Sequence, residues 1–150
     1  MEIIYSHTNI IAQDWKLLVS FYKNVFNCQE VPPQRQQSGT WLSDGTGVLD
    51  AKLEGMHLRL PGFGEKGPTL EIYSFAHMED NLPQIANRKG FGHIAFAVPD
   101  VEMTVKQILA HDGRLLGKIV KTTVQGVGEL TFVYCQDPEG NIVEVQHWKR

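Results

Sequence analysis

Apolar residues recur with a helical period after an aspartate in each half of the chain. Asp14 and Asp100 can each accept backbone N–H groups from a first helical turn, so both are predicted N-caps. The segment after Asp100 is expected to run to about His111, with Gly113 in a left-handed C-terminal cap. The spacing of three and four residues predicts one buried face per helix. These faces comprise Trp15, Leu18, Val19, Tyr22 and Phe26 in the first half, and Val105, Ile108 and Leu109 in the second.

Apolar runs with the alternation or continuity of strands lie on either side of both helices. Strands are expected over residues 3–11, 53–60, 69–75, 91–98, 114–122, 129–135 and 141–147. Between residues 29 and 60 the pattern is less regular, and Pro32-Pro33 and Asp44–Gly47 are expected to separate short extended pieces. The stretch Asp137–Gly140 has the residues of a type I turn. Each half is therefore predicted to be a βαβββ unit.

The two halves also repeat at the level of single residues. A histidine lies within each first strand and an aspartate follows seven residues later, as His7 with Asp14 and His93 with Asp100. The closing strands, 69–75 and 141–147, each carry a glutamate between aliphatic residues. Such duplication predicts the architecture.

We expect an α+β fold of two tandem βαβββ modules that form a paired, barrel-like sheet. The whole chain, 1–150, is then a single domain, with module 1 at about 1–80 and module 2 at about 90–150. One βαβββ unit leaves one sheet face apolar and uncovered, so two units must pair within a chain or between chains.

Four residues at equivalent strand positions are candidate metal ligands: His7, Glu71, His93 and Glu144. Taken singly, each has an ordinary explanation, since a strand histidine is commonly hydrogen-bonded in a core and a strand glutamate commonly faces solvent. Their recurrence in both halves favours a metal site. Two imidazoles and two carboxylates suit a divalent ion such as Ni, Co, Zn, Mn or Fe.

Other polar side chains are assigned by strand alternation. Asn9, Tyr73 and Gln146 share faces with the candidate ligands and are predicted to bind substrate. The remaining histidines are left out of the site. His57, His77 and His111 are expected at surface positions, and His147 on the face opposite Glu144.

The composition and net charge of the chain limit the kinds of partner that it can have. A chain of 150 residues, 42% of them hydrophobic, can bury a core. The net charge of −3 provides no broad positive field for nucleic acid, and no apolar stretch approaches the roughly 20 residues that span a bilayer. No secretory signal is recognised, and Cys28 and Cys135 lack a paired spacing, so a cytoplasmic protein with a small-molecule substrate is expected.

At these residues the chain resembles the vicinal oxygen chelate superfamily, which includes glyoxalase I (lactoylglutathione lyase). The best-matched stretches are residues 92–98 and 137–144. The four-ligand set is similar to that of glyoxalase I, and the resemblance implies a divalent-metal-dependent lyase or isomerase that usually forms a homodimer. In that mechanism a proton is removed next to a metal-chelated carbonyl and an enediolate forms. By this resemblance Glu144 is the base, Glu71 the complementary acid or base, and His7 and His93 hold the metal.

The resemblance leaves alternatives open. Glyoxalase I-like chains commonly have an arginine where this chain has Ile11, which weakens the expectation of glutathione as substrate. Arg35 or Arg59 are candidates to bind an anionic substrate instead, against the commoner role of a solvated arginine. The same family includes epimerases, extradiol-type dioxygenases and metal-independent proteins that bind a drug or metabolite.

Overall fold

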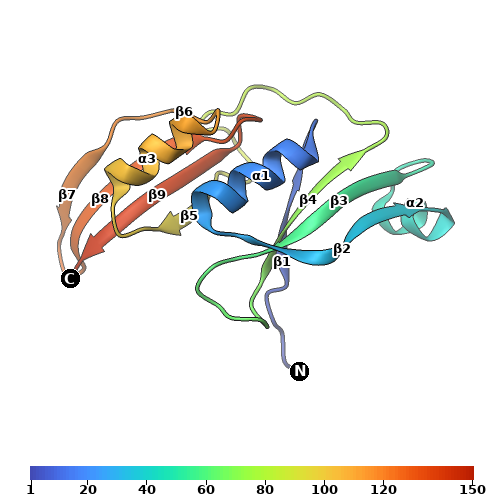
Figure 1. Cartoon of the computed structure of the whole chain (residues 1–150), viewed down its shortest axis with the longest axis horizontal. Helices are drawn as coiled ribbons and strands as arrows, with labels where there is room; N and C mark the ends of the chain where they lie inside the picture. The colour runs from blue at the N-terminus through green and yellow to red at the C-terminus, as the bar shows by residue number, and fades with distance from the viewer. The chain divides into compact units, whose positions relative to one another are not determined.

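The computed structural model describes residues 1–150, which divide into two compact units, 1–81 and 82–150. Unit 1 contains one four-stranded sheet in the order β1-β4-β3-β2 (Figure 1). β1 runs parallel to β4, and the other pairs are antiparallel. Its elements are β1 (His7–Ile11), α1 (Trp15–Phe26), β2 (Gln29–Ser38), α2 (Thr40–Thr46), β3 (Lys52–Arg59) and β4 (Thr69–Phe75).

Unit 2 repeats this plan without a counterpart of α2. Its sheet has the order β5-β9-β8-β6, with β7 also paired to β8, and β5 runs parallel to β9. The elements are β5 (Ile94–Ala97), α3 (Val101–Ala110), β6 (Arg114–Leu115), β7 (Val120–Val124), β8 (Gly128–Gln136) and β9 (Ile142–Lys149). The predicted α+β class is confirmed, with two mixed sheets, neither of which closes into a barrel.

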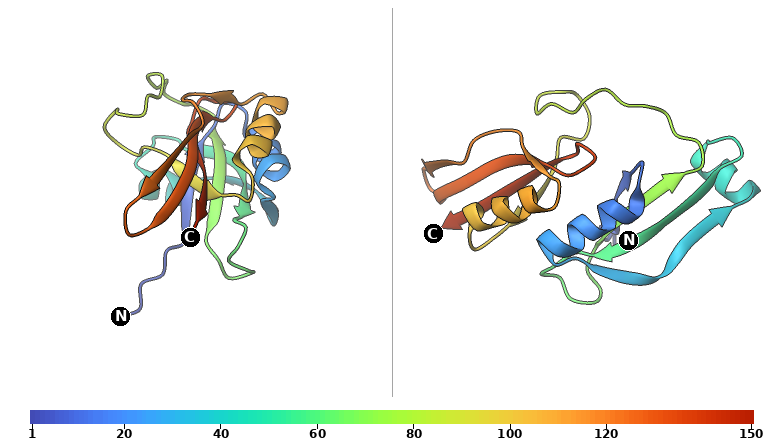
Figure 2. Two further views of the ribbon diagram at one scale, coloured as in Figure 1. Left: turned by 90° about the vertical axis from the view of Figure 1, so that its left-hand side faces the viewer. Right: turned by 45° about the horizontal axis from the view of Figure 1, so that its top comes forward.

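Each helix covers one face of the sheet in its own unit. α1 packs against β3 and β4, and α3 against β8 and β9 (Figure 2). The caps are as predicted, because Asp14 Oδ1 accepts the Leu17 N–H at 3.1 Å and Asp100 Oδ1 accepts the Met103 N–H at 2.9 Å. The cores under the helices include Leu18, Tyr22, Leu58, Leu70 and Ile72 in unit 1, and Ile108, Val133, Cys135, Val143 and Val145 in unit 2. The opposite sheet face has no helix on it in unit 2, whereas in unit 1 Leu42 of α2 packs on that face against Leu53 and Tyr73.

Helix α3 differs from the sequence-based expectation in two details. Leu109 is 50% exposed, and the buried face is completed by Val101 at its N-terminus instead. The left-handed residue after the helix is Asp112, with φ 65°, while Gly113 has no positive φ. Glycine is needed at 113 for space, because a Cβ there would lie 2.5 Å from Ile108 Cγ2.

The irregular stretch after α1 is more ordered than its sequence suggests. Pro32-Pro33, joined by a cis peptide bond, lies inside β2 at a register shift between Val31 and Arg35. An edge strand tolerates proline at such a bulge, because one side of it needs no ladder hydrogen bonds. Asp44–Gly47, expected as a break between strands, ends helix α2, with Gly47 as its left-handed cap.

The first strand of each half is shorter than predicted. β1 begins at His7 and not at residue 3, since its partner β4 begins at Thr69 opposite it. β5 covers only Ile94–Ala97 of the predicted strand 91–98. The type I turn is confirmed by the Gly140 N–H bond to the Asp137 carbonyl at 3.0 Å. No helix has the length and apolar character that a bilayer crossing requires.

Candidate active site

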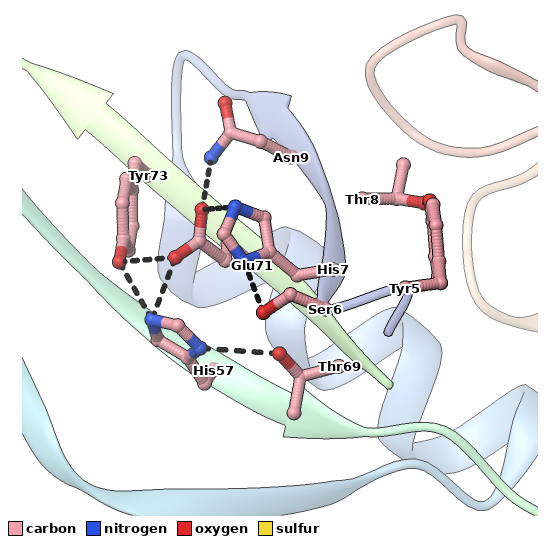
Figure 3. Close-up of polar contacts among 9 residues, drawn as sticks. All are labelled: Tyr5, Ser6, His7, Thr8, Asn9, His57, Thr69, Glu71 and Tyr73. Atoms are coloured by element: carbon pink, nitrogen blue, oxygen red, sulfur yellow. Dashed lines mark hydrogen bonds and ion pairs between the residues drawn. The ribbon is translucent and has the colours of Figure 1, made fainter. Parts of the chain in front are cut away.

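The register between β1 and β4 brings His7 and Glu71 together. Asn9 lies opposite Glu71, and His7, two residues earlier on the same face of β1, lies opposite Thr69. His7 Nε2 is 3.1 Å from Glu71 Oε1 (Figure 3). The carboxylate side chain is 11% exposed and the imidazole 41%, so Glu71 lies at the floor of the cluster and His7 at its solvent side.

Unit 2 contains a matching pair with the same offset. Ala95 lies opposite Glu144, so His93, two residues earlier, stands where His7 stands relative to Glu71. His93 Nε2 is 2.8 Å from Glu144 Oε2, and the side chains are 29% and 15% exposed, respectively. Each unit therefore contains one imidazole–carboxylate pair on the sheet face opposite its long helix, α1 or α3.

Glu71 has additional partners on β1, β3 and β4, drawn in Figure 3. His57 lies opposite Glu71 in the sheet, and its Nε2 is 2.8 Å from Glu71 Oε2. Tyr73 donates its hydroxyl to the same oxygen at 2.9 Å, and Asn9 Nδ2 donates to Oε1 at 3.4 Å. His57 Nδ1 also lies 3.2 Å from Thr69 Oγ1. Both oxygens of Glu71 are thus held by the protein.

The expectation that His57 is a surface residue was wrong, since its side chain is only 18% exposed. Its contact with Glu71 depends on the β3–β4 register. The Gly-rich loop at residues 61–68 does not specify that register. The one signal in the sequence was that His57 and Glu71 are almost equally distant from the centre of this loop, as residues paired in a hairpin are.

Burial and the carboxylate set the protonation of this cluster. Burial, aided by the hydrogen bond to Glu71, raises the pKa of Tyr73, so its phenol keeps the proton that it donates. Burial lowers the pKa of His57, against the opposing effect of Glu71, while Arg35 and His7 lower it further. Tyr73 therefore stays a neutral donor to Glu71, and the neutral form of His57 is favoured.

Glu144 has a simpler environment than Glu71. Tyr134 takes the place of His57 opposite it, and that ring packs against His93 at 4.6 Å between centroids. Gln146, the counterpart of Tyr73, accepts the Trp148 indole N–H at 2.7 Å instead of contacting the carboxylate. His93 is consequently the one polar side-chain partner of Glu144. His147 is on the other face, bonded to the Val98 carbonyl, as predicted.

The predicted substrate-binding residues lie on the expected faces. Asn9 and Tyr73 border Glu71, and Gln146 follows Glu144 on its face of β9. All three already make hydrogen bonds within the protein, so binding a substrate polar group requires them to share or exchange these bonds.

The donor atoms of both pairs fit a divalent cation. Two ligand atoms about 2.1 Å from an ion and about 90° apart are roughly 3.0 Å from each other. The N···O separations of 3.1 Å in unit 1 and 2.8 Å in unit 2 are close to this value. No group of three or more His, Cys, Asp and Glu side chains in the chain has the arrangement of a complete metal site. Each pair supplies half of the predicted ligand set.

Comparison with known proteins gives consistent relatives. Residues 4–145 match the Glyoxalase/Bleomycin resistance protein/Dioxygenase superfamily. The mitochondrial methylmalonyl-CoA epimerase of Dictyostelium discoideum is 24% identical over 141 residues, which cover 94% of this chain and 76% of that protein.

Solved structures with the same fold include a glyoxalase family protein from Bacillus cereus. It has a TM-score of 0.77 at 16% identity and covers 100% of this chain and 95% of its own. A genomically encoded fosfomycin resistance protein from Listeria monocytogenes has a TM-score of 0.59 at 20% identity, over 100% of this chain and 94% of its own. At these identities the likeness concerns the fold.

Proposed function

The chain belongs to the Glyoxalase/Bleomycin resistance protein/Dioxygenase superfamily, and we propose that it is a divalent-metal-dependent lyase or isomerase of the glyoxalase I type. The observation that carries this proposal is the matched pair of contacts, His7 with Glu71 and His93 with Glu144, at the same sheet register in both units. A shared metal site would explain why the same two residue types occupy the same register in both units.

In this proposal a divalent ion, Ni, Co, Zn, Mn or Fe, is bound by His7, Glu71, His93 and Glu144. The ion, when bound, stabilises negative charge that develops on a substrate oxygen. The protein residues determine which carboxylate is free to accept a proton from the substrate carbon. Glu71 is restrained by His57, Tyr73 and Asn9, whereas Glu144 contacts only His93.

This difference supports Glu144 as the general base. A carboxylate with one partner can turn toward a substrate carbon, accept its proton and deliver it to the adjacent carbon. Glu71, with both oxygens held, serves as the complementary acid or base only after breaking several hydrogen bonds. Asn9, Tyr73 and Gln146 are proposed to orient the substrate from positions beside the two carboxylates.

Metal analysis of the purified protein tests the ligand set. We expect stoichiometric divalent metal in the wild type and its loss in H93A and E71A, because each removes a ligand. H147Q is the matched control, since His147 lies on the opposite sheet face and should keep the metal. Protein that takes up no divalent metal when Ni, Co, Zn, Mn or Fe is supplied contradicts the proposal.

Solvent exchange tests the base. With the hemithioacetal of methylglyoxal and glutathione, and with a panel of 2-hydroxycarbonyl compounds, the wild type should incorporate deuterium from D₂O. E144Q should reduce this rate by roughly 10² to 10⁴-fold, the usual contribution of general base catalysis. Exchange at the wild-type rate in E144Q excludes Glu144 as the base.

An epimerase is the second candidate function. It is supported by the similarity to the methylmalonyl-CoA epimerase of Dictyostelium discoideum, which extends over 94% of this chain. Both functions begin with removal of a carbon-bound proton beside a carbonyl group. Methylmalonyl-CoA and related 2-substituted acyl thioesters therefore belong in the assay, where loss of optical activity without a new product identifies the epimerase.

We further propose that the chain forms a homodimer. The helix-free face of unit 2 carries Leu130, Phe132 and Trp148, which share it with Glu144 by register and need a covering surface. Sedimentation velocity tests the dimer. Mixing H7A/E71A chains with H93A/E144A chains then shows whether one site is built from two chains, because only shared sites regain metal in the mixture.

A cytoplasmic location remains a proposal. Its support is that Cys28 and Cys135 are both free and buried, as in proteins of reducing compartments. Fractionation of cells that express the tagged full-length protein tests it.

A further inference from the structure

Two arginines lie on the sheet face of unit 1 opposite α1, one on each side of Glu71. We propose that Arg35, assisted by Arg59, binds a carboxylate or phosphate group of the substrate. The inference rests on the proposed function, since it assigns this pair to the substrate of the same site.

Arg35 reaches the site across a glycine. In the sheet Arg35 lies opposite Gly55, and Gly55 lies opposite Tyr73, so the three form one row across β2, β3 and β4. Gly55 has no side chain to separate the other two residues.

Arg59 lies at the other end of the cluster. Arg59 is opposite Thr69 on β4, and Thr69 is opposite His7 on β1. The row formed by these three residues is next to that of Glu71, on the side away from the row of Arg35. Strand alternation places Arg59 on the same face as His57, because no register shift interrupts this part of β3. Both arginines are partly buried.

Neither guanidinium is neutralised within the protein. Arg35 donates from Nη1 to the Pro33 carbonyl, and no Asp or Glu oxygen forms an ion pair with Arg35 or Arg59. Glu71, the nearby carboxylate, is already engaged by His7, His57 and Tyr73. A partly desolvated, unpaired cation gains from an anionic ligand, and the fork of guanidinium donors matches carboxylate and phosphate oxygens.

The placement also constrains the substrate. Adjacent rows on one sheet face are two residues, roughly 7 Å, apart along a strand. The anionic group is therefore separated by about this distance from the atoms that face Glu71. The substrate class is a carbonyl compound with a separate carboxylate or phosphate, and a neutral analogue of the same shape should bind poorly.

Anion binding is measured on metal-free protein with malonate, its neutral analogue malonamide, and inorganic phosphate. Wild-type protein should bind malonate and phosphate saturably, and malonamide at least about tenfold more weakly, as expected for loss of a charge-assisted hydrogen bond. R35Q should weaken malonate binding by about tenfold or more and R59Q by several-fold. R35K keeps the positive charge but lacks the forked guanidinium donors, so its affinity for malonate should lie between those of the wild type and R35Q. R114Q, an exposed arginine in unit 2, is the matched control and should bind as wild type does.

Equal binding of malonate and malonamide, no saturable binding of malonate or phosphate, or wild-type affinity in R35Q each overturns the inference. Thermal unfolding shows whether each variant is folded, and the malonate–malonamide comparison needs no variant. Because the protein is free of metal, these outcomes are separate from failure of the proposed metal site. A protein that binds malonate through Arg35 but takes up no metal would retain the anion site and lose the proposed function.

Discussion

At the scale of single residues, the two candidate carboxylates differ in how firmly they are held. Glu71 is contacted by His7, His57, Tyr73 and Asn9, and its residue is 8% exposed. Glu144 meets His93 alone among polar side chains. Partners behind a ligand fix its orientation, and their removal commonly weakens metal affinity. The duplicated sequence therefore contains two carboxylates with different freedom to move.

Replacement of the groups behind Glu71 should weaken metal binding. In Y73F the carboxylate loses the hydroxyl donor at 2.9 Å, and in H57L it loses the imidazole at 2.8 Å. We expect each variant to bind Co²⁺ about 10- to 100-fold more weakly, measured by isothermal titration calorimetry. Y5F is the control, because Tyr5 is exposed and its hydroxyl contacts only Thr8. Wild-type affinity in both variants would show that Glu71 needs no support.

The buried thiol of Cys28 should make folding stability depend on alkaline pH. Burial raises the pKa of this thiol from 9.0 to about 12 in the folded protein. The folded state thus retains a proton that the unfolded state loses, so the stabilisation is complete below pH 9 and declines as pH rises toward 12. Urea midpoints at pH 8 and pH 10.5 should differ less in C28A than in the wild type. An identical pH dependence in the two proteins would exclude this cause.

At the scale of the secondary structure elements, close contact between β3 and β4 positions the cluster around Glu71. Gly55 on β3 is the residue that permits it. A Cβ at this position would lie 2.1 Å from the Ile72 carbonyl oxygen and 2.4 Å from Tyr73 Cδ1. Tyr73 can therefore lie flat beside the strand and reach both His57 and Glu71.

G55A should distort this contact and destabilise the protein. The added methyl group has to displace Tyr73 or the β4 backbone, which costs about 1–3 kcal/mol in typical overpacked sites. We expect a lower urea midpoint together with weaker Co²⁺ binding. G45A is the contrasting control, since nothing lies within 4 Å of its Cβ and the residue is in helix α2. Alanine there should leave stability unchanged or raise it by up to about 1 kcal/mol. A G55A protein as stable as the wild type would contradict the packing argument.

At the scale of the whole molecule, the chain is two compact units that each contribute one imidazole–carboxylate pair to the proposed function. Neither pair alone completes a four-ligand set. Binding of one ion by ligands from both kinds of unit would couple their stabilities, because the ion is lost when either unit unfolds. Metal binding is therefore expected to appear in the unfolding of the entire chain.

Addition of Co²⁺ should raise the thermal unfolding midpoint of the wild-type protein. At a free concentration of 100 times Kd, the stabilisation is about 2.7 kcal/mol, which corresponds to roughly 5–11 °C for a chain of this size. The whole transition should shift as one in differential scanning calorimetry, and H7A and H93A should each abolish the shift. A shift that persists in H93A would indicate that unit 1 binds the ion by itself.

The sequence alone was sufficient to predict the repeated architecture and the two imidazole–carboxylate pairs. Helical period, aspartate caps and strand alternation are local properties. They therefore predicted α1 and α3, the N-terminal caps of both helices and most of the strands from residues close together in the chain. The matching positions of His7 and His93 and of Glu71 and Glu144 followed from comparison of the two halves. The local sequence pattern predicted the structure less well where tertiary contacts determine it, as for the burial of Leu109 and the extent of the long strand β2.

Only the tertiary structure showed that His57 contacts Glu71, that Gly55 makes room for Tyr73, and that Arg35 lies in the same row. Each of these relations depends on strand register across β2, β3 and β4. Register is determined by the packing of complete strands and by the conformation of the loops between them, which no single segment encodes. A histidine in an alternating strand looks the same in sequence whether it faces solvent or a buried carboxylate.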